Sequence, residues 1–389
     1  MTVAFVSTNS ITQGEQVSIL WPELFSKYCL KIHFAHRTFE WQSEARGAAH
    51  VHVVIIGFGL FDTTKKTIYD YEHGRGDSTS VRVTNISPYL IEGEDAVVHD
   101  RRTAICDVPP IIYGSMANDD GNLVVKPEDR DSLIAKSPEI EQYLRPFYGS
   151  KEFINSISRW CIWLVDVNPS SIRSIPALMK RIEGVRKHRL KSTRPATRDL
   201  ASIPTLFGEI RQPSTPYLII PKNPSHKRPY LTVGFMDASI IASDQSLIIP
   251  NAGLYEFGVI SSKMHLAWVA TIGGRLKSDY RYSNTVVYNN YPWPQNVSDG
   301  KHKAVEEAAQ GVLDARDMHP EASLADLYDP LAMPAALSKA HAKLDRAVDR
   351  CYRSQPFPNE RNRIEYLFKL YQSLATPLLP AKKTRRKKR

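Results

Sequence analysis

Apolar positions in the first sixty residues follow the spacing of strands and of one helix. Residues 2–7, 30–34 and 51–58 are rich in β-branched and aromatic residues and predict strands. Residues 10–28 predict a helix between the first two. The apolar residues of that helix are Ile11, Val17, Leu20, Leu24 and Phe25. Because 51–58 is apolar on both faces, as in a sheet covered by helices, residues 1–62 predict the last part of an α/β sheet.

The middle of the chain has a mixed pattern. Residues 63–109 predict a loop-rich connector, and residues 110–295 combine helical and strand-like runs, which predicts a mixed α+β domain. Residues 172–191 predict a basic amphipathic helix. Its apolar side consists of Ile175, Leu178, Met179, Ile182 and Val185. Strands are expected at 217–220, 230–235, 246–249 and 286–288, with a helix at 254–270.

Helical periodicity dominates from residue 301 to residue 375. Segments 301–316, 334–352 and 359–374 carry apolar residues at helical spacing, and prolines lie at their boundaries. We therefore expect a C-terminal helical segment at 301–375. The residues after it, 376–389, end in KKTRRKKR and predict a disordered basic tail.

Positive charge is concentrated in two places. The formal net charge is +10, of which the octet 382–389 contributes seven basic residues and no acid. Within the nearly neutral remainder, residues 173–228 contain many Lys and Arg but only three acids. Such a basic segment in a balanced body indicates a face that binds a polyanion. A solvated surface of long Lys and Arg side chains is the competing interpretation.

The sequence lacks the motifs of several common enzyme activities and binding sites. The sequence contains no GxGxxG, GxxxxGK[ST], HExxH or GxSxG pattern. Its four cysteines form no CxxC pair, which argues against a zinc site or a disulfide framework. It has no secretory signal and no apolar run near the roughly 20 residues of a membrane span. We therefore expect a cytoplasmic protein with no metal and no membrane span.

Several longer segments form specific motifs that together cover nearly the whole chain. They are FVSTNSITQGEQV at 5–17, HFAHRTFEW at 33–41, VVIIGF at 53–58, GSKEFINSISRWCIWL at 149–164, GRLKSDYRYS at 274–283, YNNYPWP at 288–294, ASLADLY at 322–328 and LDRAVDRCYRSQPFP at 344–358. These segments resemble MmeI-like restriction-modification enzymes, which fuse a nuclease, an adenine methyltransferase, a target-recognition domain and helices in one polypeptide.

This resemblance implies a fold and an activity. The fold would be an α/β remnant of a class I methyltransferase sheet at 1–62, a connector at 63–109, a mixed α+β target-recognition domain at 110–295 and a C-terminal helical segment at 301–375. The activity of the intact family enzyme is methyl transfer from S-adenosylmethionine to an adenine amino nitrogen at a specific site in double-stranded DNA.

Two motifs of such methyltransferases do not occur in this sequence. The family carries a glycine-rich cofactor loop and an NPP-aromatic motif that holds the flipped adenine. Here the two Asn-Pro pairs, Asn168-Pro169 and Asn223-Pro224, are each followed by serine. We therefore expect a C-terminal fragment that binds DNA, binds no cofactor by itself and is inactive alone. A separate chain carrying the N-terminal half of the methyltransferase is one hypothesis for its partner.

Charged residues of the recognition region have spacings that suit DNA contacts. If 277–281 is extended, Lys277, Asp279 and Arg281 point to one face, and the first two would contact the guanine and the cytosine of one base pair. An exposed ion pair is the alternative. The other predicted base contacts are Lys222, Ser225 and His226, in a loop that would otherwise be only solvated. The predicted phosphate contacts are Arg186, Lys187, Arg189, Lys191, Lys227, Arg228 and Arg275.

Two further hypotheses fit the same residues. One is a stand-alone, non-catalytic DNA-binding or specificity protein. The other is the product of a decayed gene, which would fold poorly because an open sheet edge at 2–7 exposes apolar surface. RNA binding is disfavoured because the sequence has no RNP-like aromatic motif and no KH-type GxxG loop in a basic context.

Overall fold

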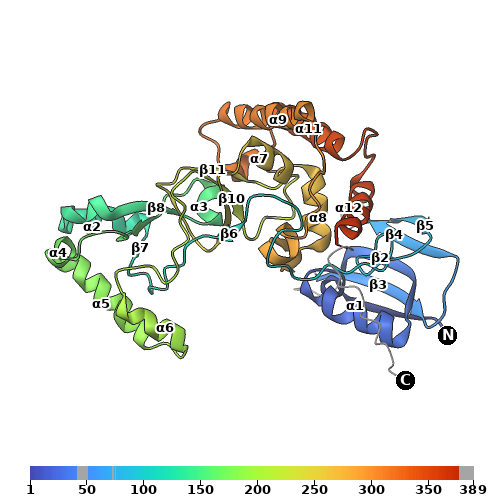
Figure 1. The fold of residues 1–389 in the computed structure, drawn as a ribbon, viewed down its shortest axis with the longest axis horizontal. Helices are drawn as coiled ribbons and strands as arrows, with labels where there is room; N and C mark the ends of the chain where they lie inside the picture. The colour runs from blue at the N-terminus through green and yellow to red at the C-terminus, as the bar shows by residue number, and fades with distance from the viewer. Residues whose placement is uncertain (42–50, 72–73, 75, 376–389) are drawn as a thin grey trace, which may run out of the picture. The chain divides into compact units, whose positions relative to one another are not determined.

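The chain forms two compact units, each assembled from segments that are distant in sequence (Figure 1). A computed structural model describes residues 1–41, 51–71, 74 and 76–375. Unit 1 comprises residues 1–108, 262–302 and 345–389, and unit 2 comprises residues 109–261 and 303–344. The chain therefore passes repeatedly from one unit to the other. The expected basic tail at 376–389 lies outside the described residues.

Unit 1 begins with a five-stranded sheet in the order β1-β3-β2-β4-β5. Neighbouring strands are antiparallel except β2 and β4, which are parallel. The strands are β1 (Val3–Thr8), β2 (Lys31–Trp41), β3 (Val51–Gly59), β4 (Lys66–Tyr71) and β5 (Ser78–Val83). The expected strands in residues 1–62 are confirmed. The sheet also continues into the expected connector, where it adds β4 and β5. These two strands were not predicted because their sequences are too polar to form an apolar run.

Helix α1 (Glu15–Tyr28) follows β1 and confirms the expected helix there. Val17 and Trp21 of α1 are buried, and the Trp21 indole nitrogen donates to the Ile11 carbonyl at 2.6 Å. This bond fixes α1 to the 3₁₀ turn η1 (Asn9–Thr12) after β1. Strand β1 lies at one edge of the sheet and Phe5 is 62% exposed, so apolar surface is open at the expected edge.

The helix expected at 254–270 is two helices, α7 (Leu254–Ile260) in unit 2 and α8 (Lys263–Ile272) in unit 1. The break occurs where the Ser262 side chain caps α8 by accepting from the His265 amide. Trp268 of α8 packs in unit 1 on Phe368 and Tyr371, with ring centroids 5.5 and 5.8 Å away. Both belong to α12 (Glu360–Ala375).

The prediction of a strand at 286–288 is wrong. Residues Asn284–Tyr288 form a single π-helical turn, η5, in which the Asn289 amide donates to the Asn284 carbonyl. Ser283 caps the turn by accepting from the Val286 amide at 3.2 Å. A short apolar run fits a buried strand and a buried helical turn equally well, so the local pattern cannot separate the two.

Unit 2 contains two four-stranded sheets, in the orders β11-β10-β13-β6 and β12-β8-β9-β7. The expected strands at 217–220 and 246–249 are confirmed as β10 and β13, whereas only the end of the run at 230–235 enters a strand. The strands are β6 (Ile112–Tyr113), β7 (Val124–Val125), β8 (Leu144–Tyr148), β9 (Trp160–Ile162), β10 (Tyr217–Pro221), β11 (Gly234–Met236), β12 (Ile241–Ala242) and β13 (Ser246–Pro250).

The helix expected at 172–191 is broken into α4 (Pro169–Arg173) and α5 (Pro176–Leu190). Pro176 has no amide hydrogen to continue a helix and instead occupies the first turn of α5. Figure 1 shows α4, α5 and α6 (Pro195–Asp199) following one another in unit 2. The remaining helices before the C-terminal segment are α2 (Pro127–Lys136) and α3 (Ser150–Asn155).

The C-terminal segment is helical, as expected. Its helices are α9 (Asp299–Asp317), α10 (Leu324–Leu327), α11 (Ala335–Tyr352) and α12. These helices do not form a compact unit of their own, because both α9 and α11 run from one unit into the other.

Candidate nucleic-acid interface

The segment that carries Lys277 is a tight hairpin rather than one extended strand. Strands β14 (Gly274–Leu276) and β15 (Asp279–Arg281) pair antiparallel, with Leu276 opposite Asp279. This register leaves Lys277 and Ser278 as a two-residue turn. Lys277 has a φ of 56°, in the left-handed region that a lysine seldom adopts.

The prediction that Lys277, Asp279 and Arg281 share one strand face is therefore corrected. Asp279 and Arg281 lie two residues apart on β15 and do share a face. Lys277 instead projects from the tip of the hairpin and is exposed. The three charged side chains remain within one five-residue segment of unit 1. The direction of the Lys277 side chain is set by its place in the turn and not by the alternation of side chains along a strand. Their contact with bases stays a prediction.

Arg275 supports this hairpin from within. Its guanidinium carbon lies 4.1 Å from the centroid of the Tyr280 ring, and its nitrogens donate to the Ser278 carbonyl, the Gln13 side chain and the Ala270 carbonyl. Burial lowers the pKa of Arg275, an effect opposed by Tyr280. Three of its nitrogens have partners inside unit 1, which favours a structural role for Arg275 over the predicted phosphate contact.

The base of the hairpin is seated against the start of α1. The Gly14 amide donates to the Ile272 carbonyl at 3.0 Å, and a Cβ on Gly14 would lie 3.1 Å from the Gly274 Cα. Gly14 also has a φ of 63°, so both its backbone angle and the lack of space require glycine. Segments 5–17 and 274–283 are thus in contact within unit 1, and this contact holds the β14–β15 hairpin in place.

The loop at 222–228 connects β10 to β11 in unit 2. Its first residue is anchored, because the Lys222 amide donates to the Ser150 hydroxyl at 3.1 Å and the Lys222 ammonium lies 5.1 Å from the centroid of the Tyr113 ring. The Ser225 hydroxyl accepts from the Lys227 amide. His226 and Arg228 are half-buried, and Lys227 is exposed. The loop is therefore internally organised, with a lysine at its surface.

Helix α5 has one buried stripe and one basic exposed side. Leu178, Ile182 and Val185 form the buried stripe, whereas Met179, expected there, is 38% exposed. The exposed basic residues include the predicted phosphate contacts Arg186, Lys187 and Lys191. Arg186 lies 3.8 Å from the Glu183 carboxylate, an exposed pair of little energetic weight.

Arg189 continues the buried stripe, and its predicted phosphate contact is wrong. Its side chain is fully buried, and its guanidinium donates to five backbone carbonyls at 2.7–3.1 Å. Burial lowers the pKa of Arg189, and the negative charge of buried Asp119 opposes that effect. With its donors turned inward, this guanidinium cannot reach DNA. The five carbonyls belong to Ala117, Asn118, Leu200, Ile203 and Leu206.

A basic hollow of about 420 Å³ lies beside the end of α5 in unit 2. Of its basic lining residues, only Lys191 is a predicted DNA contact, whereas His188 and Arg194, which line the same space, are not among the predicted contacts. Their place beside other basic residues was the available signal. The lining residues are Met116, Asn118, His188, Lys191, Ser192, Arg194 and Thr197, and we call this space the α5–α6 hollow.

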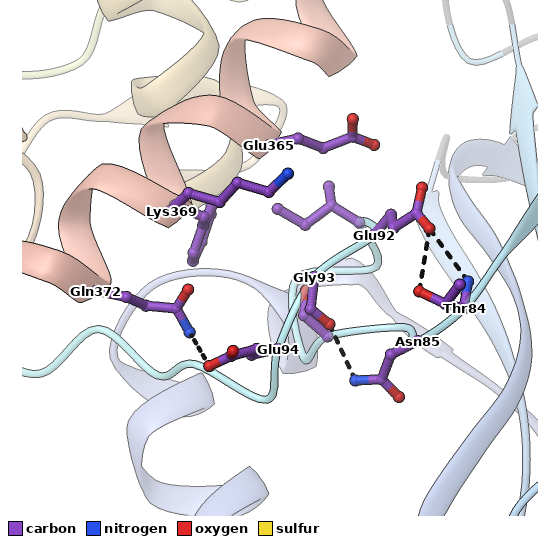
Figure 2. Close-up of a pocket in the computed structure, with 11 residues that line it drawn as sticks. Thr84, Asn85, Glu92, Gly93, Glu94, Glu365, Lys369 and Gln372 are labelled. Carbon is purple, nitrogen blue, oxygen red and sulfur yellow. Dashed lines mark hydrogen bonds between the residues drawn. The ribbon is translucent and has the colours of Figure 1, made fainter.

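A second hollow, of about 350 Å³, lies in unit 1 and has the opposite character. Figure 2 shows Glu92, Glu94 and Glu365 around it, with Lys369 as its basic member. Glu92 accepts from the amide and hydroxyl of Thr84. An excess of carboxylates disfavours phosphate groups, so this hollow is not a candidate for DNA contact.

Two further features concern residues 1–41, 51–71, 74 and 76–375, which the structure describes. In that part of the chain, no three His, Cys, Asp or Glu side chains are arranged to hold a metal ion. None of its helices is both long and apolar enough to cross a membrane.

Comparison with protein families and known proteins gives consistent matches along the chain. The model of the MmeI target recognition domain matches residues 92–295, that of the MmeI C-terminal domain residues 297–379, and that of the MmeI DNA-methyltransferase domain residues 1–70. The first match covers more than half of the sequence. It includes the β14–β15 hairpin, the loop at 222–228 and α5.

Two relatives extend these matches. DNA methyltransferase A of Bacillus subtilis (strain 168) is 42% identical over 372 residues, which are 96% of this chain and 41% of that protein. The structure of the Type IIL restriction-modification enzyme MmeI in complex with DNA has a TM-score of 0.88 and 47% identity, and covers 97% of this chain and 50% of MmeI. The chain thus spans half or less of the length of these two relatives.

Proposed function

Because the chain belongs to the MmeI family, we propose that it supplies DNA sequence recognition to a site-specific adenine DNA methyltransferase of a restriction-modification system. The observation that carries this proposal is the match of the target recognition domain to residues 92–295. The proposed partner is double-stranded DNA, and the related MmeI structure is in complex with DNA. A cytoplasmic location is part of the proposal, since the chain has free cysteines that suit a reducing compartment.

The methyl donor of the proposed reaction is S-adenosylmethionine, which would supply the methyl group when bound to the intact enzyme. We propose that the described residues do not complete the catalytic centre, because neither Asn-Pro pair forms the NPP-aromatic motif that would hold the target adenine. Asn168, the first of the two Asn-Pro asparagines, is a helix cap whose side chain accepts from the Ser170 amide and hydroxyl at 3.0 and 2.9 Å. Pro224, in the second pair, is buried in the loop at 222–228. We therefore propose no cofactor-binding or catalytic residue among the residues that the structure describes.

The division of labour that we propose follows from exposure and charge. Lys277, Asp279 and Arg281 on the β14–β15 hairpin would contact base edges, as would Lys222, Ser225 and His226 of the loop at 222–228. Arg186, Lys187, Lys191, Lys227 and Arg228 would contact phosphates, which position the protein without specifying sequence. The cofactor-binding and methyl-transfer groups would come from sequence outside these residues, on the same or on another polypeptide.

The test is selection from a random duplex library. The purified chain is titrated against the library with and without S-adenosylmethionine, and the bound fraction is sequenced. We expect enrichment of one short site, equal with and without the methyl donor, and no methyl transfer to the enriched DNA by this chain alone. Binding that decreases with salt but enriches no sequence would contradict the proposal, because only non-specific phosphate contacts behave in that way.

A further inference from the structure

The buried Arg189 lies in the chain between His188 and Lys191, which line the α5–α6 hollow. Its guanidinium donates to the carbonyl of Asn118, another lining residue, at 3.0 Å. It also donates to the carbonyls of Ala117, Leu200, Ile203 and Leu206 at 2.7–3.1 Å, which lie outside the lining. Two chain segments more than seventy residues apart are thereby tied to the end of α5, next to the hollow. This buried network restrains the backbone that carries His188, Lys191 and Asn118.

The connection between α5 and α6 is fixed as well. The Arg198 guanidinium donates to the carbonyls of Ser192 and Thr193, both at 3.0 Å, and the Ser192 hydroxyl accepts from the Arg194 amide at 3.2 Å. These bonds hold Lys191 and Arg194 on the same side of the turn, where both line the hollow. Two basic side chains are thus positioned by backbone that is itself restrained.

The charges of the hollow are unbalanced. Lys191 and Arg194 are exposed, and among the described residues neither side chain has a carboxylate partner. His188 is half-buried, with its Nδ1 3.9 Å from the Asp120 carboxylate. No acidic side chain of the described residues lines the hollow, and Asn118, Ser192 and Thr197 add neutral hydrogen-bonding groups. This combination of cations and small polar groups is suited to a phosphate.

We propose that the α5–α6 hollow holds one phosphate of the DNA backbone, with Lys191 and Arg194 as its charged contacts and Arg189 as the buried positioning residue behind them. This inference rests on the proposed function. It assigns the basic end of α5 one defined contact with a DNA phosphate, in place of a general attraction between a charged surface and DNA. A free phosphate ion would meet the same chemistry, so the experiment must separate these two sources.

The experiment compares Lys191→Ala, Arg194→Ala and the double variant of the full chain with Lys180→Ala. Lys180 is exposed on the same helix but does not line the hollow. Affinity for an enriched duplex and for an unrelated duplex is measured over a range of salt concentrations. We expect the double variant to weaken binding to both duplexes equally and to reduce the slope of log K against log[salt] by about 1. Lys180→Ala should leave the slope unchanged.

Three other outcomes would overturn the inference, each for a separate reason. If the parent chain binds no duplex, the proposed function fails and this inference fails with it. If the parent binds DNA and the double variant has the same affinity and slope, the hollow lies away from the backbone. If inorganic phosphate binds the parent without DNA, and only that binding is lost in the double variant, the hollow is a small-anion site. Unchanged circular dichroism of the variants excludes a folding defect.

Discussion

The guanidinium of Arg275 lies 4.1 Å from the centre of the Tyr280 ring, directly across the β14–β15 hairpin. The same guanidinium donates to the Ser278 carbonyl in the turn and to Gln13 at the start of α1. A residue that the sequence predicts as a phosphate contact thus holds the β14–β15 hairpin in shape. The hairpin tip with Lys277 depends on this support for its position.

Replacing Arg275 by lysine should distinguish the structural role of its guanidinium from the effect of its positive charge. Arg275→Lys keeps the positive charge but cannot stack on Tyr280 while donating to three acceptors. We expect the free energy of unfolding to fall by about 1–3 kcal/mol, measured by urea denaturation, with a broader preference in the enriched DNA site. Arg281→Lys, at an exposed position of the same hairpin, is the matched control for stability alone, because Arg281 is itself a proposed base contact. A stable Arg275→Lys variant that only binds DNA more weakly would return Arg275 to the phosphate contacts.

Lys277 offers a substitution that removes the side chain without disturbing the turn. Its φ of 56° suits glycine, so Lys277→Gly should leave the thermal midpoint unchanged or slightly higher. Discrimination at one base pair of the enriched site should fall by about 1–3 kcal/mol, measured by competition with single-base variants of the site. Equal losses on all duplexes would show that the ammonium contacts a phosphate instead.

Arg189 should be essential for stability. Arg189→Met fills similar space but leaves five carbonyls without their donor and removes one of the positive charges near Asp119. Loss of such a buried charged group costs about 3–5 kcal/mol, so we expect an early urea transition or failure to fold. Arg186→Met, on the exposed side of α5, should change stability by less than about 0.5 kcal/mol. Equal midpoints for the two variants would refute the structural role of Arg189.

The stability of unit 1 should decrease in acid because of His265. This side chain is fully buried, its Nε2 lies 2.8 Å from the Tyr282 hydroxyl, and burial lowers its pKa to about 3. Between that value and the unfolded pKa of about 6.5, the unfolded chain binds the extra proton. Stability from this group is therefore complete above about pH 6.5 and falls by up to about 1.4 kcal/mol per pH unit below it.

Urea denaturation at a series of pH values measures this dependence. His265→Gln has no titrating ring, so its stability should vary less with pH over the same interval, although its stability near neutral pH is lower. Parallel pH profiles for the parent chain and His265→Gln would exclude His265 as a source of acid sensitivity.

Much of the fold could be predicted where apolar residues form long or alternating runs. Strands β1–β3, β10 and β13 and the helices of the C-terminal segment were predicted for that reason. Strand β5 could not be, because STSVRV is mostly polar and exposed. The hairpin at Lys277 was mistaken for an extended strand because neither turn residue is Gly, Asn or Asp, which usually mark such turns.

The sequence predicted which residue types form the candidate site better than it predicted how those residues are arranged. Basic residues of α5 were found from charge alone, but charge could not show which of them is buried. Arg189 faces inward because its acceptors come from 117–118 and 200–206, which only the folded chain brings together. The grouping of His188 and Arg194 with Lys191 in the α5–α6 hollow is also set by the folded chain, so the sequence showed only that they lie in a basic segment.

The central claim is that the β14–β15 hairpin specifies one base pair of the DNA site. The most direct measurement is selection from a random duplex library with the parent chain and with the double variant Lys277→Glu, Asp279→Arg. We predict that the two enriched sites differ at a single base pair and that each protein binds its own site with similar affinity. An unchanged site, or uniformly weaker binding to every duplex, would contradict the claim and place these residues on the DNA backbone or away from it.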